Sequence, residues 1–152
     1  MKIQIPDSME LRVAKVTQKK EIKVNAFVAK EWNKWVKKNK YDHVTKKYAF
    51  AAYIDNKIAG YISLKINGGV AYLSQLIVSD AVREMGIGTS LLKKFESCAR
   101  LNKCHLAYLE THEKNVAALS LYKHNGYSII ATLKNNRFHF TWYILSKNLK
   151  RV

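Results

Sequence analysis

Arg83-Glu84-Met85-Gly86-Ile87-Gly88 is the stretch of sequence on which the fold prediction depends. It follows an apolar run from Ala71 to Val78 that is typical of a strand. It opens a segment in which apolar residues recur every four positions, as in a helix: Ile87, Leu91, Phe95 and Ala99. A strand, a glycine-bearing turn and a helix together present unpaired backbone N–H groups at the positive end of the helix dipole. The segment therefore predicts an anion site, most naturally for a pyrophosphate group.

Three phosphate-binding patterns compete for this segment. A P-loop requires Gly-x-x-x-x-Gly-Lys-Ser/Thr, and no Lys-Ser/Thr pair follows Gly88. A dinucleotide-binding turn requires a small third residue where Leu91 stands, although Glu110 falls about 20 residues further on, where such folds carry a ribose-binding acid. The third pattern, Arg-x-x-Gly-x-Gly, has all three of its positions filled, beginning at Arg83.

This third pattern resembles the acetyl-CoA pyrophosphate loop of the GNAT family of N-acetyltransferases. A second stretch, Leu109–Tyr127 (LETHEKNVAALSLYKHNGY), is similar to the closing motif of that family. The motif is a strand ending near an Asn, then Ala and Leu-Tyr on a helix, then Gly-Phe/Tyr entering the next strand. Among family members it is most similar to the ribosomal-protein N-terminal alanine acetyltransferases. The resemblance covers about Leu73 to Tyr127 and implies transfer of an acetyl group from acetyl-CoA to a primary amine.

Composition fits one globular domain over residues 1–152, with 48% hydrophobic and 25% charged residues. No apolar run approaches the ~18–20 residues of a membrane span, and the first residues contain no apolar signal core. Cys98 and Cys104 lack metal-site spacing, and the five histidines form no zinc-like pair. Reduced thiols of this kind indicate the cytoplasm. We expect no metal and no membrane contact, with monomer and dimer both open.

The formal net charge of +16 is the unusual quantity in this composition. Lysines dominate it, with runs over residues 15–23 and 34–47. A solvated, lysine-rich surface is the simplest account. The alternative is attraction to CoA, to an acidic protein, or to nucleic acid and ribosomes. The same field argues against a freely diffusing polycationic acceptor such as a polyamine.

Periodicity divides the chain into alternating predicted elements. Strands are expected at 10–17, 48–54, 57–66, 70–78, 105–111, 127–133 and 138–145, and helices at 19–39, 86–102 and 116–123. Turns are expected at Asp55-Asn56, Gly68-Gly69 and Asn135-Asn136, with Gly126 as a helix C-cap. The early hairpins predict antiparallel pairing, and the unit over residues 70–111 adds a parallel pair with a right-handed crossover. The prediction is an α/β fold with a mixed, mostly antiparallel sheet of about seven strands and helices on both faces, as in the GNAT family.

Acetyl transfer to an amine needs a base, because only the free amine attacks. Glu110 is the candidate base, and by resemblance its spacing to Tyr122 matches that of the N-terminal alanine acetyltransferases. A solvated glutamate at a strand end is the alternative. His112 is the second candidate, since histidine titrates near neutral pH. Tyr72 stands near where other branches of the family, such as histone acetyltransferases, carry a glutamate, which argues against that base and that substrate class.

Resemblance also implies the residues that bind acetyl-CoA. Tyr122 would protonate the CoA sulfur, or else serve as a core aromatic. Asn115 would bond the pantetheine arm, and it also suits the N-cap of the helix at 116–123; both roles can hold together. Ile77 and Val78 would offer backbone N–H groups to the thioester and the pantetheine, with their side chains in the core. The pyrophosphate would lie on main-chain N–H groups, with an added hydroxyl from Thr89, in the segment made of Arg83, Glu84, Met85, Gly86, Ile87, Gly88 and Thr89.

The leading hypothesis is direct transfer in a ternary complex with acetyl-CoA and a primary amine. The amine belongs to a protein N-terminus, a lysine or a small molecule, and no cysteine is placed to carry an acyl group. Two alternatives are a catalytically silent CoA-binding regulatory module and a basic nucleic-acid- or ribosome-associated protein. A dinucleotide-binding enzyme is the least favoured alternative. The expected acceptor loops, around Trp32 to Lys47 and Asn135 to His139, mix aromatics and lysines without a readable code.

Overall fold

The structure is a computed structural model that describes residues 14–15, 17–40 and 44–149. The chain divides into two compact units, residues 1–41 and 42–152. The strand predicted at 10–17 lies outside the described residues except for Ala14, Lys15 and Thr17, which are not in a strand. A single domain over the whole chain stays a prediction.

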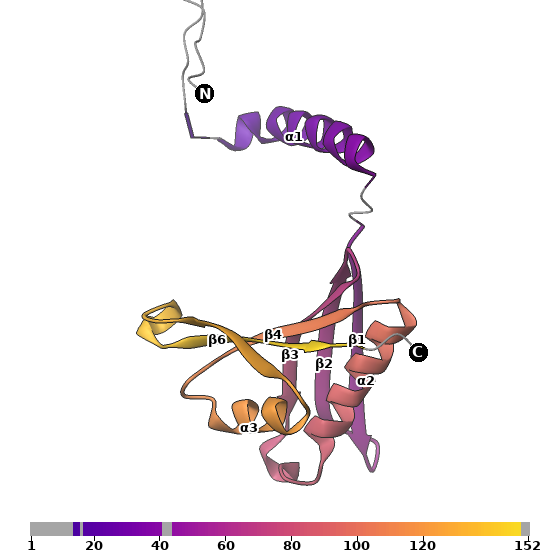
Figure 1. Cartoon of the computed structure of the whole chain (residues 1–152), viewed down its shortest axis with the longest axis vertical. Helices are drawn as coiled ribbons and strands as arrows, with labels where there is room; N and C mark the ends of the chain where they lie inside the picture. Colours follow the sequence, from indigo (N-terminus) through magenta and orange to yellow (C-terminus); the bar gives the residue numbers. More distant parts are fainter. Residues whose placement is uncertain (1–13, 16, 41–43, 150–152) are drawn as a thin grey trace, which may run out of the picture. The chain divides into compact units, whose positions relative to one another are not determined.

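The first unit contains the helix α1 (Gln18–Asn39), which confirms the helix predicted at 19–39 (Figure 1). The indole rings of Trp32 and Trp35 stack on it, with centroids 5.2 Å apart. The helix ends at Lys40, which adopts a left-handed φ of 56° and donates its N–H to carbonyls of the last turn. Neither α1 nor another helix in the described part of the chain is long and apolar enough to cross a membrane.

The second unit is built on one six-stranded mixed sheet (Figure 1). Its strands are β1 (Lys46–Ile54), β2 (Lys57–Asn67), β3 (Val70–Val78), β4 (Leu106–His112), β5 (Ser128–Leu133) and β6 (Trp142–Asn148). They lie in the order β1-β2-β3-β4-β6-β5; β3 and β4 are parallel, and all other neighbours are antiparallel. The described residues confirm the mixed, mostly antiparallel sheet, with six strands where about seven were expected.

Two hairpin turns confirm the turn predictions. Asp55 and Asn56 have φ values of 47° and 62°, and Gly68 and Gly69 have 55° and 78°. Positive φ at both central residues is type I′ geometry, whose twist matches that of the flanking strands. Local turn chemistry therefore fixes how β1, β2 and β3 pair.

The strand predicted to follow the turn at Asn135-Asn136 begins later than expected. The strand expected to start at Phe138 instead begins at Trp142, and residues 137–139 form a 3-10 turn. Asn135, Phe138 and His139 all have left-handed φ values, which an extended strand cannot contain. Phe138 is 78% exposed, so burial in a sheet does not reward its aromatic strand propensity.

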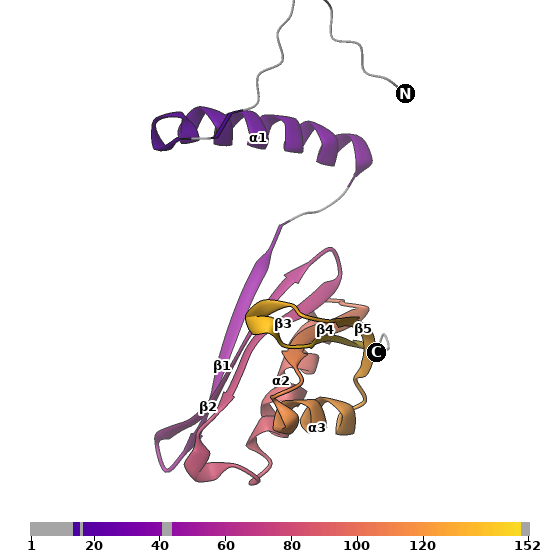
Figure 2. The same cartoon turned by 90° about the vertical axis from the view of Figure 1, so that its left-hand side faces the viewer.

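Two helices of this unit pack on one face of the sheet. α2 (Ile87–Leu101) connects β3 to β4, and α3 (Val116–His124) follows β4, both within a residue of prediction. Both lie on the same side of β1 and β2 (Figure 2). The largest fully buried side chains lie between helices and sheet: Phe95, Ile62, Leu64, Leu92, Leu109 and Leu145. Helices on both faces of this sheet stay a prediction.

A β-bulge reverses the expected orientation of Ile77. Ser63 pairs with Gln75, but Leu64 pairs with Leu73, so β3 carries one extra residue at this point. A one-residue shift moves every later side chain to the other face of the sheet. Val78 therefore packs against the core as predicted, whereas the prediction of a core side chain for Ile77 is wrong, since it is 58% exposed.

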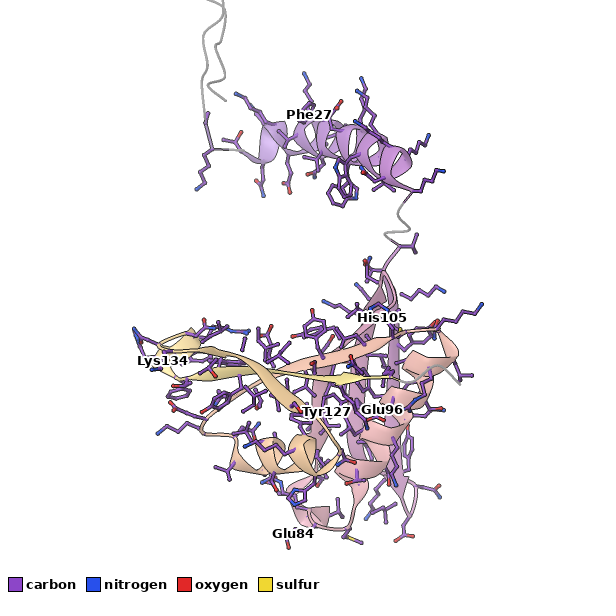
Figure 3. All side chains as sticks on the ribbon, in the orientation of Figure 1. Phe27, Glu84, Glu96, His105, Tyr127 and Lys134 are labelled. Atoms are coloured by element: carbon purple, nitrogen blue, oxygen red, sulfur yellow. The ribbon has the colours of Figure 1, made fainter. Side chains whose placement is uncertain are left out.

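A buried ionic cluster joins α2, the end of α3 and β6. The Lys147 ammonium donates to both carboxylate oxygens of Glu96, at 2.8 and 2.9 Å, and to the Asn125 carbonyl at 2.8 Å. Arg100 donates to Glu96 at 3.1 Å, and the Glu96 side chain is only 8% exposed. Burial and the nearby Glu96 raise the pKa of Tyr127, which lies beside this cluster (Figure 3). A buried carboxylate with these partners is costly to leave unpaired.

Lys147→Met should therefore destabilise the fold by about 3 kcal/mol, because it removes the main partner of a buried carboxylate. Replacing Glu96 by Leu in the same variant should restore much of that loss, since no uncompensated charge remains. Equilibrium urea unfolding measures both. Lys134→Met, which removes an exposed lysine, is the matched control and should change stability by less than about 0.5 kcal/mol. Equal losses for Lys147→Met and Lys134→Met would contradict the structural role of the cluster.

Candidate active site

The glycine-bearing turn that was predicted to bind an anion lies at the N-terminus of α2. Gly86, with φ of 77°, precedes the helix, and no side chain caps it. The first bond that closes the helix runs from the Ser90 N–H to the Gly86 carbonyl, at 3.0 Å. The N–H groups of Ile87, Gly88 and Thr89 therefore lack intrahelical acceptors, and no other backbone carbonyl in the described residues accepts from them. This is an open cluster of donors at the positive end of a helix dipole.

The glycines around this loop have different tasks. A Cβ at Gly86 would meet nothing within 4 Å, so the space above the loop is open. A Cβ at Gly88 would lie 3.2 Å from Leu121, so Gly88 permits α3 to pack close to α2. Gly60 on β2 was not singled out from the sequence, yet a Cβ there would come within 2.9 Å of Leu91. Gly60 on the sheet therefore permits the close packing of α2, and a bulky Leu91 on the helix is compatible with this packing.

Charged residues of the loop lie at its rim. Arg83 pairs with Asp80 at 2.5 Å, and both side chains are largely exposed. Such a surface pair is worth at most about 1 kcal/mol, so Arg83 can exchange Asp80 for a bound anion. Glu84 has a left-handed φ of 66° and lies at the tip of the unit (Figure 3). Met85 is also exposed, so the main chain of the loop would be its anion-binding element.

The sheet opens between β3 and β4. These strands pair only from Val70–Leu106 to Tyr72–Tyr108, although β3 continues to Val78 and β4 to His112. Their facing edges beyond Tyr72 and Tyr108 are therefore not paired with each other. The outer edge of β3 stays paired with β2, where Ile77 opposes Tyr61. Among the described residues no ladder joins these inner edges, so their backbone groups can bind an extended ligand.

Tyr122 is a core residue with an available hydroxyl. It is 6% exposed, and its ring meets Tyr127 edge-on with centroids 6.1 Å apart. Burial raises the pKa of Tyr122 to about 12. The phenol therefore keeps its proton at neutral pH, as a general acid must. Its hydroxyl has no hydrogen-bond partner within the described part of the chain. The core position and the acid role are compatible.

Asn115 confirms its predicted capping role. Its side-chain oxygen accepts a hydrogen bond from the Ala118 N–H at 3.3 Å, which caps the N-terminus of α3. The side-chain amide makes no hydrogen bond within the described residues, so it remains free to donate to a ligand. At the other end of α3, Gly126 has φ of 84°, and the Tyr127 N–H returns to the Tyr122 carbonyl at 3.0 Å. This predicted C-cap fixes Tyr122 relative to Tyr127.

Glu110 lies on the sheet face opposite the core. Ala107, Leu109 and Thr111 are buried, so the alternation of β4 places Glu110 on the other side. Its Oε2 accepts a hydrogen bond from Arg137, and its Oε1 has no hydrogen-bond partner within the described residues. Its side chain is 26% exposed. Glu110 is thus a half-buried carboxylate with one oxygen engaged and one free.

Aromatic side chains lie on the same face of the sheet as this carboxylate. The His112 ring lies between Phe140 and Trp142, at centroid distances of 5.4 and 5.2 Å. His112 Nδ1 is buried with no partner among the described residues. Tyr72 stacks against Tyr108 at 4.8 Å, and burial followed by the charge of Glu110 raises the pKa of Tyr72. Both candidate bases therefore lie on one face of the sheet, together with aromatic side chains.

The candidate residues thus form two groups. The loop over residues 83–89, Asn115 and Tyr122 lie on the helical side of the sheet, whereas Glu110 and His112 lie on the other. Tyr122 and Glu110 make no hydrogen bond with each other. Within the described residues, no three His, Cys, Asp or Glu side chains gather as a metal site.

Arg137 and Trp142 were not among the site residues predicted from the sequence. Arg137 donates to Glu110 across 27 positions of sequence, and its guanidinium lies 4.0 Å from the centroid of the Trp142 ring. The sole signal was the mixture of aromatics and cations around Asn135 to His139.

Tyr122→Phe should make the fold less sensitive to alkaline pH. An unfolded tyrosine ionises near pH ~10, whereas burial raises the pKa of Tyr122 to about 12. The stabilisation that the protonated, buried Tyr122 gives to the fold is complete below pH ~10. It is lost as the pH rises towards about 12, by up to roughly 1.4 kcal/mol per pH unit. Urea unfolding at about pH 9 and about pH 11 measures this, and the wild type should lose more stability than the variant. Tyr53→Phe, at an exposed tyrosine, should lose as much as the wild type; equal losses in all three proteins would contradict the assignment.

Comparison with known proteins identifies one family. The Acetyltransferase (GNAT) family matches residues 18–127. The chain is 32% identical over 99 residues to an N-alpha-acetyltransferase of Sulfurisphaera tokodaii, covering 57% of this chain and 59% of that relative. It is 35% identical over 81 residues to streptothricin acetyltransferase A of Bacillus subtilis, covering 52% and 47%. An acetyltransferase structure from Bacillus cereus superposes with a TM-score of 0.74 at 18% identity, covering 91% of this chain and 98% of that one.

The chain spans about half the length of the curated relatives it matches. Their names point to different acceptors at similar identity, so no subtype is established, and the likeness to ribosomal-protein alanine acetyltransferases stays a prediction. The family match covers more than half of the 152 residues, including the anion loop, Asn115 and Tyr122. On these grounds the chain belongs to the GNAT acetyltransferase family.

Proposed function

We propose that the chain is an acetyl-CoA-dependent N-acetyltransferase that transfers an acetyl group directly to a primary amine. The observation that carries this proposal is the opening between β3 and β4. An open anion loop and a protonated phenol lie on the helical side of the sheet, and a carboxylate with a free oxygen lies on the other. Donor and acceptor can therefore approach from opposite faces and meet where the strands do not pair.

The residues on the helical side suit acetyl-CoA. The N–H groups of residues 84–89 and the Thr89 hydroxyl would hold the pyrophosphate, and the open space at Gly86 admits it. Asn115 and the backbone of Ile77 and Val78 would bind the pantetheine arm and the thioester. Acetyl-CoA supplies an electrophilic acyl carbon and a thiolate leaving group.

Glu110 would take the proton of the arriving amine on its free Oε1. A protein α-amino group has a pKa of about 8, so the fraction protonated at neutral pH must lose a proton before attack. His112, on the same face, remains the second candidate. Tyr122 would donate its proton to the departing sulfur, since burial keeps the phenol neutral.

Direct transfer is favoured over an acyl-cysteine route. Cys98 and Cys104 are buried, and burial raises the pKa of both thiols, which disfavours the nucleophilic thiolate. As the acceptor we favour a protein N-terminus, on the resemblance of residues 109–127 to the ribosomal-protein alanine acetyltransferases. Lysines and small amines are the other acceptors to be assayed.

Gly86→Trp should abolish acetyl-CoA binding, because an indole at this open position would cover the N–H cluster. Isothermal titration calorimetry measures the affinity directly. Gly68→Trp is the matched control: its φ of 55° is also left-handed and its surroundings are also open, but it lies in the β2–β3 turn. The control should bind as the wild type does. Wild-type protein that fails to bind acetyl-CoA but binds RNA in a salt-dependent way would instead favour the nucleic-acid alternative.

Tyr122→Phe should lower kcat by about a hundredfold while leaving the affinity for acetyl-CoA nearly unchanged, since general-acid catalysis typically contributes ~10²–10⁴-fold. Steady-state acetylation of a peptide and small-amine panel, followed by mass spectrometry, gives the rates. Tyr127→Phe removes a neighbouring buried hydroxyl and should retain turnover. Unchanged kcat in Tyr122→Phe would remove the acid role. Tight acetyl-CoA binding without transfer to any amine would indicate a silent CoA-binding module.

A further inference from the structure

Arg137 makes several contacts beside the candidate base. Its guanidinium donates to Glu110 Oε2 and lies over the Trp142 ring, 4.0 Å from the centroid. The Trp142 indole N–H donates in turn to the Arg137 carbonyl at 3.1 Å, so one ring holds both the side chain and the backbone of Arg137. A planar guanidinium in such a stack has lost much of its rotational freedom before a ligand arrives.

Most of the hydrogen-bonding capacity of Arg137 is unused. A guanidinium has five N–H donors, and within the described residues Arg137 uses one of them, towards Glu110. Its side chain is 55% exposed, so the remaining donors reach solvent. Two adjacent N–H groups in this fork match the two oxygens of a carboxylate.

A positive charge lies directly beside this carboxylate. Glu110 is the acid that faces Arg137, and Glu113 nearby is engaged by the Thr141 N–H at 3.1 Å. Lys114 lies 5.6 Å from the Phe140 ring, on the same aromatic cluster. An ammonium approaching Glu110 would therefore meet the positive charge of Arg137. An acceptor that brings its own carboxylate would relieve this repulsion.

We propose that Arg137 is a specificity-determining residue that binds a carboxylate of the acceptor, so that the preferred acceptors are primary amines with a carboxylate close by. This inference rests on the proposed function, with Glu110 Oε1 receiving the amine. Because Arg137 holds the other oxygen of the same carboxylate, a group a few bonds from the amine reaches the free N–H donors of Arg137. Two kinds of acceptor carry a carboxylate close to the amine. One is a free amino acid, through its α-carboxylate, and the other is a peptide with an acidic side chain near its N-terminus.

Matched acid and amide acceptors test the proposal. One pair is alanine and alaninamide, and the other is the peptide amides Ala-Asp-Ala and Ala-Asn-Ala. The wild type should favour the acid by about tenfold or more in kcat/KM in at least one pair, and that pair identifies the kind of acceptor. Arg137→Gln should reduce this ratio to near one. Arg137→Lys should retain part of it, because it keeps the charge and loses the fork. Lys134→Gln removes a neighbouring cation of the hairpin and should keep the wild-type ratio.

The outcomes separate this inference from the proposed function. Acetylation of acids and amides at equal rates, or an acid preference that survives in Arg137→Gln, overturns the role of Arg137 and leaves the acetyltransferase proposal standing. Failure of the wild-type protein to bind acetyl-CoA overturns the proposed function instead. If neither pair is acetylated, calorimetry of the same four compounds with the CoA-bound protein decides. Equal binding of acid and amide then overturns the inference.

Discussion

The brief parallel pairing between β3 and β4 is the constraint on which the rest of the structure depends. Parallel neighbours need a crossover, so α2 must start near the carboxyl end of β3, which places its unpaired N–H groups there. Pairing ends at Tyr72 and Tyr108, so the facing edges of both strands beyond this point remain open. The anion loop and the strand opening are therefore two consequences of one topological choice.

The position of α3 depends on interactions at both of its ends. Asn115 caps its start, and the Gly126 turn returns the Tyr127 N–H to Tyr122 at its end. Lys147 binds the Asn125 carbonyl and Glu96 together, which ties this end to α2 and β6. Gly88 lets Leu121 pack close to the anion loop. The phenol of Tyr122 is thus held by the core itself, and the same burial keeps it protonated.

Local chemistry explains what could be predicted. Turns at Asp55-Asn56 and Gly68-Gly69, the helices and the glycine-bearing turn before α2 depend on neighbouring residues, and all were predictable. Ile77 was misplaced because a bulge, which depends on pairing with β2, reverses the alternation. The packing role of Gly60 and the contact of Arg137 with Glu110 join segments far apart in sequence, and no short pattern records them.

This difference explains why the sequence is more informative about the donor than about the acceptor. Pyrophosphate binding needs main-chain N–H groups, which a glycine-bearing helix start supplies within a few residues. Recognition of an acceptor needs side chains of particular charge and shape, and the ones proposed here come from β4 and from the segment between β5 and β6. The proposed acid and base also lie on opposite faces of the sheet, so neither constrains the residues around the other. The acceptor surface can therefore vary while the donor loop keeps one pattern.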